Sequence, residues 1–365
     1  MHLIITLLII SLLVLVHELG HFLTAKKAGI KIEEFGFGLP PRLVGKRVGE
    51  TLYSLNLLPF GGFVRLSGED EASENTPSQR QFLFQSKKIR TVVLTAGVVA
   101  NLAFGLVAFS TVYSVSGIPT LTDQVKVIDV FPNSPAAFTL AAGDIITQVN
   151  QQEVTSISQF TQIINDKEDT PVTLTIQRNG EVKTVSLTPR SQPPEGEGPL
   201  GVVISQTEII YPPLWQRPFV GAWYGLKEAL FWGWATVLGL AHLFIDLFTR
   251  GALPQDIAGP VGIYQLTGFA AESGVLGLLN FTGILSINLA IINILPLPAL
   301  DGGRLLFVFL EKLRGQPVNI KFERAAHVAG MVLLLSFIFA VTINDILRLT
   351  GTANLGQLLT RLFSR

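Results

Sequence analysis

Long apolar runs alternate with polar segments along this chain, and the runs predict membrane-spanning helices. Residues 1–24 are almost entirely apolar up to a short polar cluster. A run of about 20 such residues is long enough to cross the hydrocarbon core of a bilayer. Further runs follow at 91–116, 276–311 and 327–348. We therefore expect a polytopic α-helical membrane protein with four transmembrane helices.

The polar segments between these runs predict the topology. Residues 25–90 carry lysines and arginines near both membrane ends, and the loop at 312–326 is basic as well. Because basic loops tend to stay on the cytoplasmic side, we place both segments in the cytoplasm. The two termini, including a tail at 349–365, and the segment 119–206 are then expected outside the cytoplasm.

Two stretches of the first cytoplasmic segment alternate apolar residues with glycine. One stretch, 34–38, contains Gly36, Phe37 and Gly38, and the other is 59–66. Alternation of this kind predicts a β-hairpin or a re-entrant loop. We expect this element to lie against the membrane.

Residues 119–206 contain no apolar run of spanning length, and their pattern is typical of a small α+β domain. Asn179-Gly180 predicts a hairpin turn between two strands. Period-two and period-3.6 patterns predict the other elements. The expected strands are 125–131, 144–149, 172–178 and 183–188, and the expected helix is 158–165.

The stretch 207–275 leaves two interpretations open. Its central part, 229–245, is apolar enough to span a membrane, but charged residues such as Glu228 and Asp246 interrupt it and tryptophans cluster there. An amphipathic helix in the membrane interface fits these features. We favour the interface, with a fifth span as the alternative.

Composition supports the membrane class and limits the chemistry. The chain is 48% hydrophobic and only 15% charged, with a mean hydropathy of +0.46, whereas soluble domains carry about 25% charged residues. A formal net charge of 0 gives no indication of nucleic-acid binding. Because the chain has no cysteine, a zinc ion would need histidine, aspartate or glutamate ligands.

The polar cluster that ends the first apolar run is His17-Glu18-Leu19-Gly20-His21. On a helix this spacing places His17 and His21 one turn apart on one face, where they can share a zinc ion. Glu18 lies beside them and can take a proton from a metal-bound water. The alternative is that these polar side chains only extend from a helix end toward lipid headgroups.

Asp301 is the candidate for a third ligand. It follows an apolar run that Pro296 and Pro298 break, and a carboxylate at membrane depth needs a partner. His17 and Asp301 both lie near the expected cytoplasmic ends of their helices, so they can meet at a similar depth. Two imidazoles and one carboxylate leave a fourth zinc position open for water, which is the catalytic arrangement.

Together these motifs resemble the site-2 protease family, and in particular its bacterial regulator-of-sigma-E protease type. The resemblance implies a bacterial inner-membrane enzyme with zinc ligands His17, His21 and Asp301 and with Glu18 as general base. It also implies that Asn293 and Asn288 hold the substrate backbone and that the glycine loop at 36–38 pairs with an extended substrate. Helix–helix packing is the alternative role for the two asparagines.

The segment 119–206 resembles a bacterial PDZ domain through its residues 132–150 and 198–202. The resemblance implies that backbone amides at Leu200, Gly201 and Val202 receive a peptide terminus, and a structural spacer is the alternative. Only one such domain is apparent in the sequence, whereas the enterobacterial members of the family carry two.

We therefore predict an intramembrane zinc metalloendopeptidase that acts in regulated intramembrane proteolysis. The family analogy implies single-span substrates already cut by a site-1 protease, such as anti-sigma factors or remnant signal peptides. A non-catalytic PDZ-bearing scaffold or chaperone of the same fold is one alternative, and the intact Glu18 argues against it. A metal transporter is another, and the scattered His2, His242 and His327 argue against that.

Overall fold

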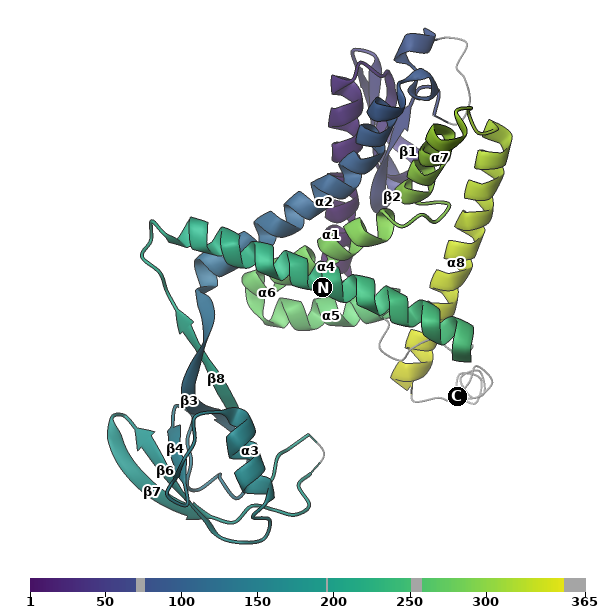
Figure 1. Cartoon of the computed structure of the whole chain (residues 1–365). Helices are drawn as coiled ribbons and strands as arrows, with labels where there is room; N and C mark the ends of the chain where they lie inside the picture. The colour runs from purple at the N-terminus through teal and green to yellow at the C-terminus, as the bar shows by residue number, and fades with distance from the viewer. Residues whose placement is uncertain (70–75, 195, 251–257, 351–365) are drawn as a thin grey trace. The chain divides into compact units, whose positions relative to one another are not determined.

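The computed structural model describes residues 1–69, 76–194, 196–250 and 258–350 of the chain (Figure 1). They form two compact units, one made of Met1–Val115 and Trp215–Arg365 and the other of Ser116–Leu214. We describe each unit by itself.

The first unit is mainly helical. Five of its described helices are long and apolar enough to cross a membrane by length and composition. Four of them contain the runs expected to span, and the fifth is the stretch for which we favoured an interfacial position. The five helices are α1 (His2–Lys27), α2 (Lys87–Ser116), α4 (Arg217–Arg250), α6 (Gly274–Asn293) and α8 (Ile320–Thr350).

Shorter elements connect these helices. Two 3₁₀ turns, η1 (Ser78–Arg80) and η2 (Phe82–Phe84), precede α2, and α5 (Pro260–Glu272) precedes α6. Neither η1, η2 nor α5 was expected from the sequence pattern. The pattern within 207–275 also gave no sign that a second helix follows α4.

The range 276–311, expected as one transmembrane element, is two separate helices. α6 ends at Asn293, and α7 (Asp301–Arg314) begins only after the Pro296 and Pro298 segment. Proline lacks an amide hydrogen and disfavours helical backbone in the residue before it. Asp301 is therefore the first residue of a new helix and not part of the apolar one.

A β-sheet covers part of the first unit. β1 (Ile32–Val48) and β2 (Thr51–Leu66) pair in a two-stranded antiparallel sheet. Both strands are long and fold back, so that the first part of β1 lies between two parts of β2. Residues 34–37 of β1 pair with 62–65 of β2 on one side and with 52–55 on the other.

A small apolar core joins the sheet to the helices. Phe22 of α1, Ile32 of β1, Leu66 of β2, Val93 of α2 and Val308 of α7 are all buried in it. Their contact fixes one end of each of these five elements against the others. This core therefore sets the relative positions of α1, α2 and α7.

The second unit is an α+β fold with strand order β7-β6-β4-β3-β8, and β5 pairs with β4. One helix, α3 (Ile157–Asn165), buries Phe160 and Ile164 against the sheet, and the Ser156 side chain accepts a hydrogen bond from its N-terminal turn. Three parts were not expected, the first residues of β3, the short β5 and all of β8. The strands are β3 (Ile118–Val130), β4 (Ile145–Val149), β5 (Gln152–Glu153), β6 (Val172–Arg178), β7 (Glu181–Leu187) and β8 (Val202–Ile210).

Candidate metal centre

Three side chains from the two ends of the sequence meet in the first unit. His17 and His21 lie one turn apart on α1, and Asp301 reaches them from the first turn of α7. Nε2 of His17 is 2.9 Å and Nε2 of His21 is 3.2 Å from Oδ2 of Asp301, and the two Nε2 atoms are 3.1 Å apart. The two histidines are buried and Asp301 is half-buried. The three residues form the only such group of potential metal ligands among the described residues.

The arrangement of these three atoms fits a divalent ion. In a tetrahedral site with ligands about 2.0–2.1 Å from zinc, two ligand atoms are separated by roughly 3.3–3.4 Å. The observed separations of 2.9–3.2 Å are close to this value for all three pairs. Hydrogen bonds alone cannot satisfy all three pairs, because two Nε2–H groups that both donate to Asp301 cannot also donate to one another. The donor set of two imidazoles and a carboxylate is one that zinc uses in catalytic sites.

One face of α2 positions the imidazole rings. Nδ1 of His21 lies 2.8 Å from the backbone oxygen of Val93, so an N–H at Nδ1 can donate there and leave the Nε2 lone pair facing the cluster. One turn later comes Gly97, where a Cβ atom would lie 2.7 Å from Nε2 of His17. Only glycine therefore lets α2 approach both rings. The sequence pattern gave no signal for this role beyond a glycine inside an apolar helix.

Glu18 lies beside the cluster and points toward the sheet. Its Oε2 accepts a hydrogen bond from the backbone N–H of Val64 in β2, at 3.0 Å. It lines a cavity of about 240 Å³ together with His21, Ala299 and Asp301. A carboxylate in this position is near enough to exchange protons with a molecule in the cavity while it remains outside the ligand set.

Asp301 is held by the turn that precedes α7. Ala299, two residues earlier, has a left-handed φ of +82°, which is unfavourable for a residue with a Cβ. Its N–H donates to Nδ1 of His327 in α8, at 3.0 Å. The sequence pattern assigned His327 no role at the site, and the fold places it against the turn that carries Asp301.

A buried ion pair anchors the rest of α7. Arg90 of α2 and Glu311 of α7 form a contact of 2.7 Å, and both side chains are almost fully buried. Lys87 donates to the backbone oxygen of Glu311 at 2.9 Å. These contacts keep α7 packed against the same helix that holds the histidines.

The glycine motif does not offer the open sheet edge that we expected. Gly36 and Phe37 pair with β2 on both sides, and the Asn56 side chain donates to the backbone oxygens of Phe37 and Gly38. An extended substrate cannot add to this strand without displacing a partner. Residues 62–66 of β2 have β1 on one side only, and a Cβ at Gly62 would lie 3.9 Å from Cγ of Glu18.

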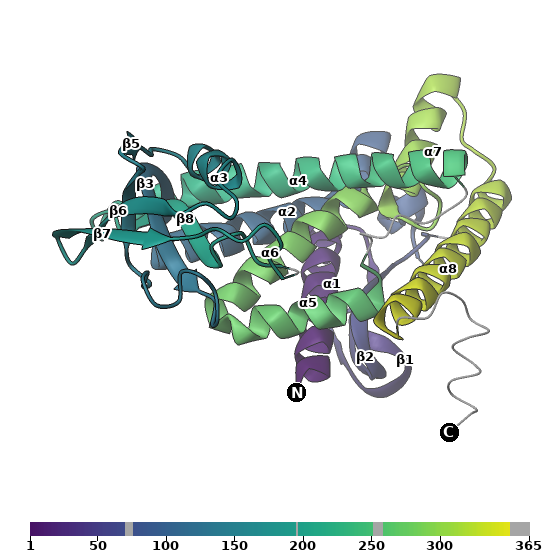
Figure 2. The ribbon, with the colours of Figure 1, turned by 90° about the horizontal axis from the view of Figure 1, so that it is seen from below.

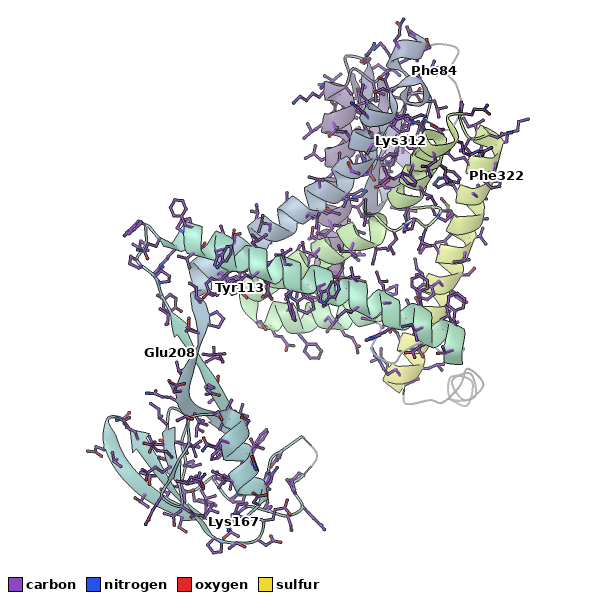
Figure 3. All side chains as sticks on the ribbon, viewed as in Figure 1. Phe84, Tyr113, Lys167, Glu208, Lys312 and Phe322 are labelled. Atoms are coloured by element: carbon purple, nitrogen blue, oxygen red, sulfur yellow. The ribbon has the colours of Figure 1, made fainter. Side chains whose placement is uncertain are left out.

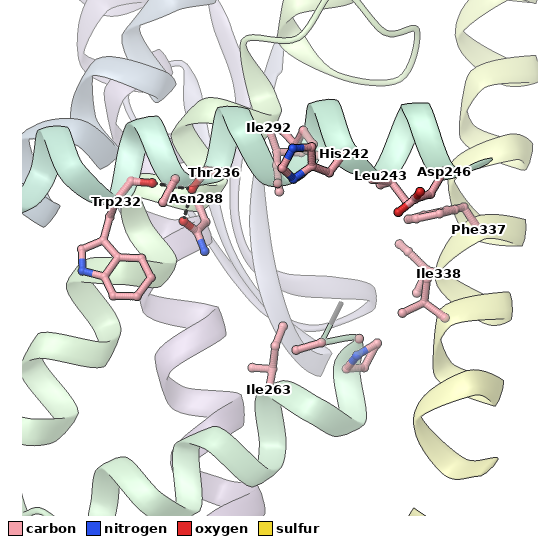
Figure 4. A pocket seen from close by; sticks show the side chains of 17 residues that line it. Trp232, Thr236, His242, Leu243, Asp246, Ile263, Asn288, Ile292, Phe337 and Ile338 are labelled. Carbon is pink, nitrogen blue, oxygen red and sulfur yellow. Dashed lines mark hydrogen bonds between the residues drawn. The ribbon is translucent and has the colours of Figure 1, made fainter. Parts of the chain in front are cut away.

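The two asparagines expected to hold a substrate have different surroundings. Asn293 is the last residue of α6 and is half-buried. Asn288 accepts a hydrogen bond of 2.6 Å from the Thr236 hydroxyl of α4, drawn as a dashed line in Figure 4. It lines a mainly apolar cavity of about 760 Å³, which also has walls from α4, α5 and α8. The structure therefore gives Asn288 a helix–helix hydrogen bond, which was the alternative role.

The expected peptide-binding loop of the second unit is partly used by the fold itself. Gly201 has a φ of +68°, and its N–H donates to the Gly198 oxygen at 2.9 Å. The oxygen of Leu200 accepts from Ala136, and Val202 pairs with Val130. The Gly201 amide therefore already has a partner within the loop.

Comparison with known proteins places the chain among bacterial proteases. A putative zinc metalloprotease of Clostridium perfringens is 34% identical over 350 residues, covering 95% of this chain and 99% of that protein. Zinc metalloprotease RasP of Geobacillus kaustophilus is 31% identical over 413 residues, covering 92% of this chain and 95% of that protein.

Among solved structures, the PDZ domain of the SdrC-like protein of Listeria innocua is 25% identical. The match covers 24% of this chain and all of that chain, with a TM-score of 0.22. The family model described as "Peptidase family M50" matches residues 5–337 of this chain. With that match over most of its length and with relatives above 30% identity, the chain belongs to Peptidase family M50.

Proposed function

We propose that this chain, a multi-pass zinc metalloendopeptidase of the inner membrane, hydrolyses peptide bonds within the transmembrane segments of single-span proteins. The observation that carries the proposal is the convergence of His17, His21 and Asp301 beside Glu18, at the end of a helix long and apolar enough to span a bilayer. A hydrolytic centre in this setting has access to bonds that soluble proteases do not reach.

Each residue of the cluster has a chemical role in this proposal. His17, His21 and Asp301 hold the ion, and a zinc ion bound there lowers the pKa of its water and polarises the scissile carbonyl. Glu18 accepts the proton of the attacking water and delivers it to the leaving amine nitrogen. Its hydrogen bond from Val64 keeps the carboxylate at the edge of the cavity.

The substrate must be extended when it reaches this centre. A transmembrane helix has all its backbone groups bonded internally, so a segment has to unwind before water can attack a carbonyl. We place the unwound segment along residues 62–66 of β2, which pair with β1 on one side only. A substrate strand there would replace side-chain acceptors, since the Val64 N–H now donates to Glu18 and the Leu66 N–H to Glu69. Added strands gain main-chain hydrogen bonds that compensate the unwound groups. Asn293, at the end of α6, is our candidate for a further contact with the substrate backbone.

Four helices span the membrane in this proposal, and α4 lies in the interface. α4 runs crosswise to α1 in both Figure 1 and Figure 2. Its charged residues also have interfacial partners: Tyr113 (labelled in Figure 3) donates to Glu228 at 2.9 Å, and Lys227 lies 5.2 Å from the ring of Trp223.

With four spans, both termini and the PDZ-like second unit lie outside the cytoplasm, and residues 25–90 lie inside. The sheet of β1 and β2 then lies against the membrane, and one end of it reaches the middle of α1, where the Ser11 hydroxyl donates to the Pro59 oxygen at 2.6 Å. Its exposed apolar side chains support this placement, since exposed apolar patches of this kind mark membrane or protein contacts. They are Leu39, Leu43, Val44, Leu55, Leu57 and Leu58.

The substrates that we propose are single-span proteins already trimmed outside the membrane by a site-1 protease, such as anti-sigma factors or remnant signal peptides. The PDZ-like unit would then act on the trimmed end, either by binding it or by excluding larger domains. A second hypothesis, a scaffold or chaperone without activity, predicts that Glu18 is dispensable.

One experiment separates these hypotheses. We expect purified wild-type protein in proteoliposomes to cleave a model single-span substrate. The Glu18→Gln variant should lose at least about 100-fold in rate, because a positioned base contributes roughly 10²–10⁴-fold, and should keep its zinc. The zinc content of both proteins is measured after purification without chelators. Cleavage by Glu18→Gln at the wild-type rate contradicts the mechanism, and a wild-type protein without zinc contradicts the ligand assignment.

A further inference from the structure

A buried asparagine of α2 lies against the outer ring nitrogen of His17. The Asn101 side chain is 0% exposed, and its amide nitrogen is 3.4 Å from Nδ1 of His17. The amide oxygen is buried and has no hydrogen-bond partner among the described residues. A buried carbonyl oxygen without a partner is rare and is costly in free energy.

The orientation of this amide determines which nitrogen of His17 carries the proton. If the amide nitrogen faces His17, it donates to Nδ1, and a neutral imidazole then carries its proton on Nε2. Nε2 is the atom that faces Asp301 and His21, and a protonated Nε2 has no lone pair to offer to a metal. This orientation therefore conflicts with a metal centre and also leaves the amide oxygen unsatisfied.

The opposite orientation resolves both problems. The two ends of an asparagine amide have nearly the same shape, so the same side-chain position accommodates either one. With the oxygen facing His17, Nδ1–H donates to Asn101 and the Nε2 lone pair points into the cluster. The buried oxygen then has its hydrogen bond, and the ring has the tautomer that binds a metal.

His21 already has the matching arrangement. Its Nδ1 lies 2.8 Å from the backbone oxygen of Val93, which can only accept. Val93, Gly97 and Asn101 follow one another at intervals of four residues on α2, so they lie on one face of the helix. The first orients His21, the second leaves room for both rings, and the third faces His17.

We propose that Asn101 is a positioning residue that accepts the Nδ1 proton of His17 and so holds the Nε2 lone pair of that histidine toward the metal. The inference rests on the proposed zinc centre and adds a residue that acts through a ligand. The backbone of Asn101 is fixed independently, because the Ser286 hydroxyl of α6 donates to its carbonyl oxygen at 2.8 Å.

The test compares zinc affinity in full-length variants reconstituted in nanodiscs, measured by competition with a chromophoric chelator. Asn101→Leu keeps the volume and removes the acceptor, and we expect zinc affinity to fall roughly 10- to 100-fold, as for other outer-shell partners of metal ligands. Asn101→Asp keeps an acceptor at the same place and should bind zinc within about threefold of wild type, a smaller change than the loss expected for Asn101→Leu. Ser286→Ala is the matched control, because it removes the other hydrogen bond of the same residue and should leave the affinity unchanged.

A second measurement needs no variant of Asn101. In zinc-loaded protein with ¹⁵N-labelled histidine, NMR detects ring N–H groups that donate hydrogen bonds by their downfield proton shift. We expect two such Nδ1–H signals to appear with zinc, one from His21 bonded to Val93 and one from His17 bonded to Asn101. This measurement decides the question even if Asn101→Leu fails to fold.

The possible outcomes are distinct. A wild-type protein that binds no zinc refutes the proposed metal centre. If wild type binds zinc and Asn101→Leu binds it equally well, the metal centre stands and the role of Asn101 is refuted. Equal weakening in the Leu and Asp variants also overturns the inference, since packing and not the acceptor would then explain the effect. A zinc-loaded protein with only one hydrogen-bonded Nδ1–H signal overturns it as well.

Discussion

Replacing Gly97 with alanine should disrupt the metal cluster without touching any ligand. The new Cβ would lie 2.6 Å from Cε1 and 2.7 Å from Nε2 of His17, and it would lie closer still to Nε2 of His21. Ordinary contact with carbon begins near 3.4 Å, so both imidazoles have to move away from α2, each by about 0.7 Å or more. Neither ring can retreat freely, because His21 is bonded to Val93 and both rings pack against α2.

This displacement is large on the scale of metal coordination. Functional metal–ligand distances vary by about 0.2 Å, and a misplacement of about 1 Å in a catalytic site costs roughly 100-fold in rate. We therefore expect Gly97→Ala to lose at least about tenfold in zinc affinity and on the order of 100-fold in substrate cleavage. Chelator competition measures the first, and cleavage of a model transmembrane substrate in proteoliposomes measures the second.

Gly105→Ala provides the matched control. Gly105 lies two turns further along α2, and a Cβ there would meet Cδ1 of Ile287, also at 2.7 Å. It would also lie 2.9 Å from Cγ1 of Ile287 and 3.2 Å from the backbone oxygen of Gly283, so Gly105→Ala crowds the packing of α2 on α6 without touching an imidazole. The two variants add the same methyl group to the same helix, and only the first should affect zinc. Wild-type affinity and activity in Gly97→Ala would refute the reasoning.

Two further predictions concern other parts of the chain. His327→Leu removes the acceptor for the Ala299 N–H, so the turn before Asp301 should loosen and zinc affinity should fall roughly tenfold, as measured by chelator competition. In the second unit, burial raises the pKa of Asp144, but hydrogen bonds from Arg178 at 2.6 and 2.7 Å outweigh it and hold that pKa below its ordinary value. Its stabilising contribution is then present above about pH 4 and is lost as the pH falls through the lowered pKa of the folded state. Arg178→Gln should destabilise this unit by about 1.5–3 kcal/mol at neutral pH and reduce this loss in acid, as measured by pulse proteolysis between pH 3 and 7.

Each of these predictions has a control. His242→Leu removes a histidine of α4 and should leave zinc affinity unchanged, so an equal loss in both histidine variants would point to general destabilisation. For the second unit, Lys183→Gln removes a mostly exposed cation that pairs with the exposed Glu181. It should have little effect, because exposed ion pairs contribute about 0–1 kcal/mol. An Arg178→Gln protein whose acid sensitivity equals that of wild type would contradict the assignment to Asp144.

The parts of the site that follow from local pattern could be predicted from the sequence. The spacing of His17 and His21 on an apolar helix places both rings on one face, whatever the rest of the fold does. Pro296 and Pro298 end the preceding helix because of their own backbone chemistry. Asp301, which follows them, joins the histidines in the structure. Its place at the start of a new helix was not anticipated.

Contacts between distant segments could not be predicted in this way. Nothing in the pattern around Val93 or Gly97 indicates that this face of α2 packs on the histidines. From the sequence, His327 is only one of three scattered histidines, yet the fold places it against Ala299. The glycine motif was expected in a β-hairpin or a re-entrant loop, and its pairing on both sides depends on how β1 and β2 fold back along one another.

The distance along the chain between the ligands also limits when the centre can form. His17 and Asp301 are 284 residues apart, and a ribosome adding about 5–20 residues per second needs roughly 15–60 s to make the intervening chain. Until α7 has been synthesised and packed, the two histidines lack their carboxylate partner. A growing chain therefore inserts its first helices into the membrane before it can acquire proteolytic activity.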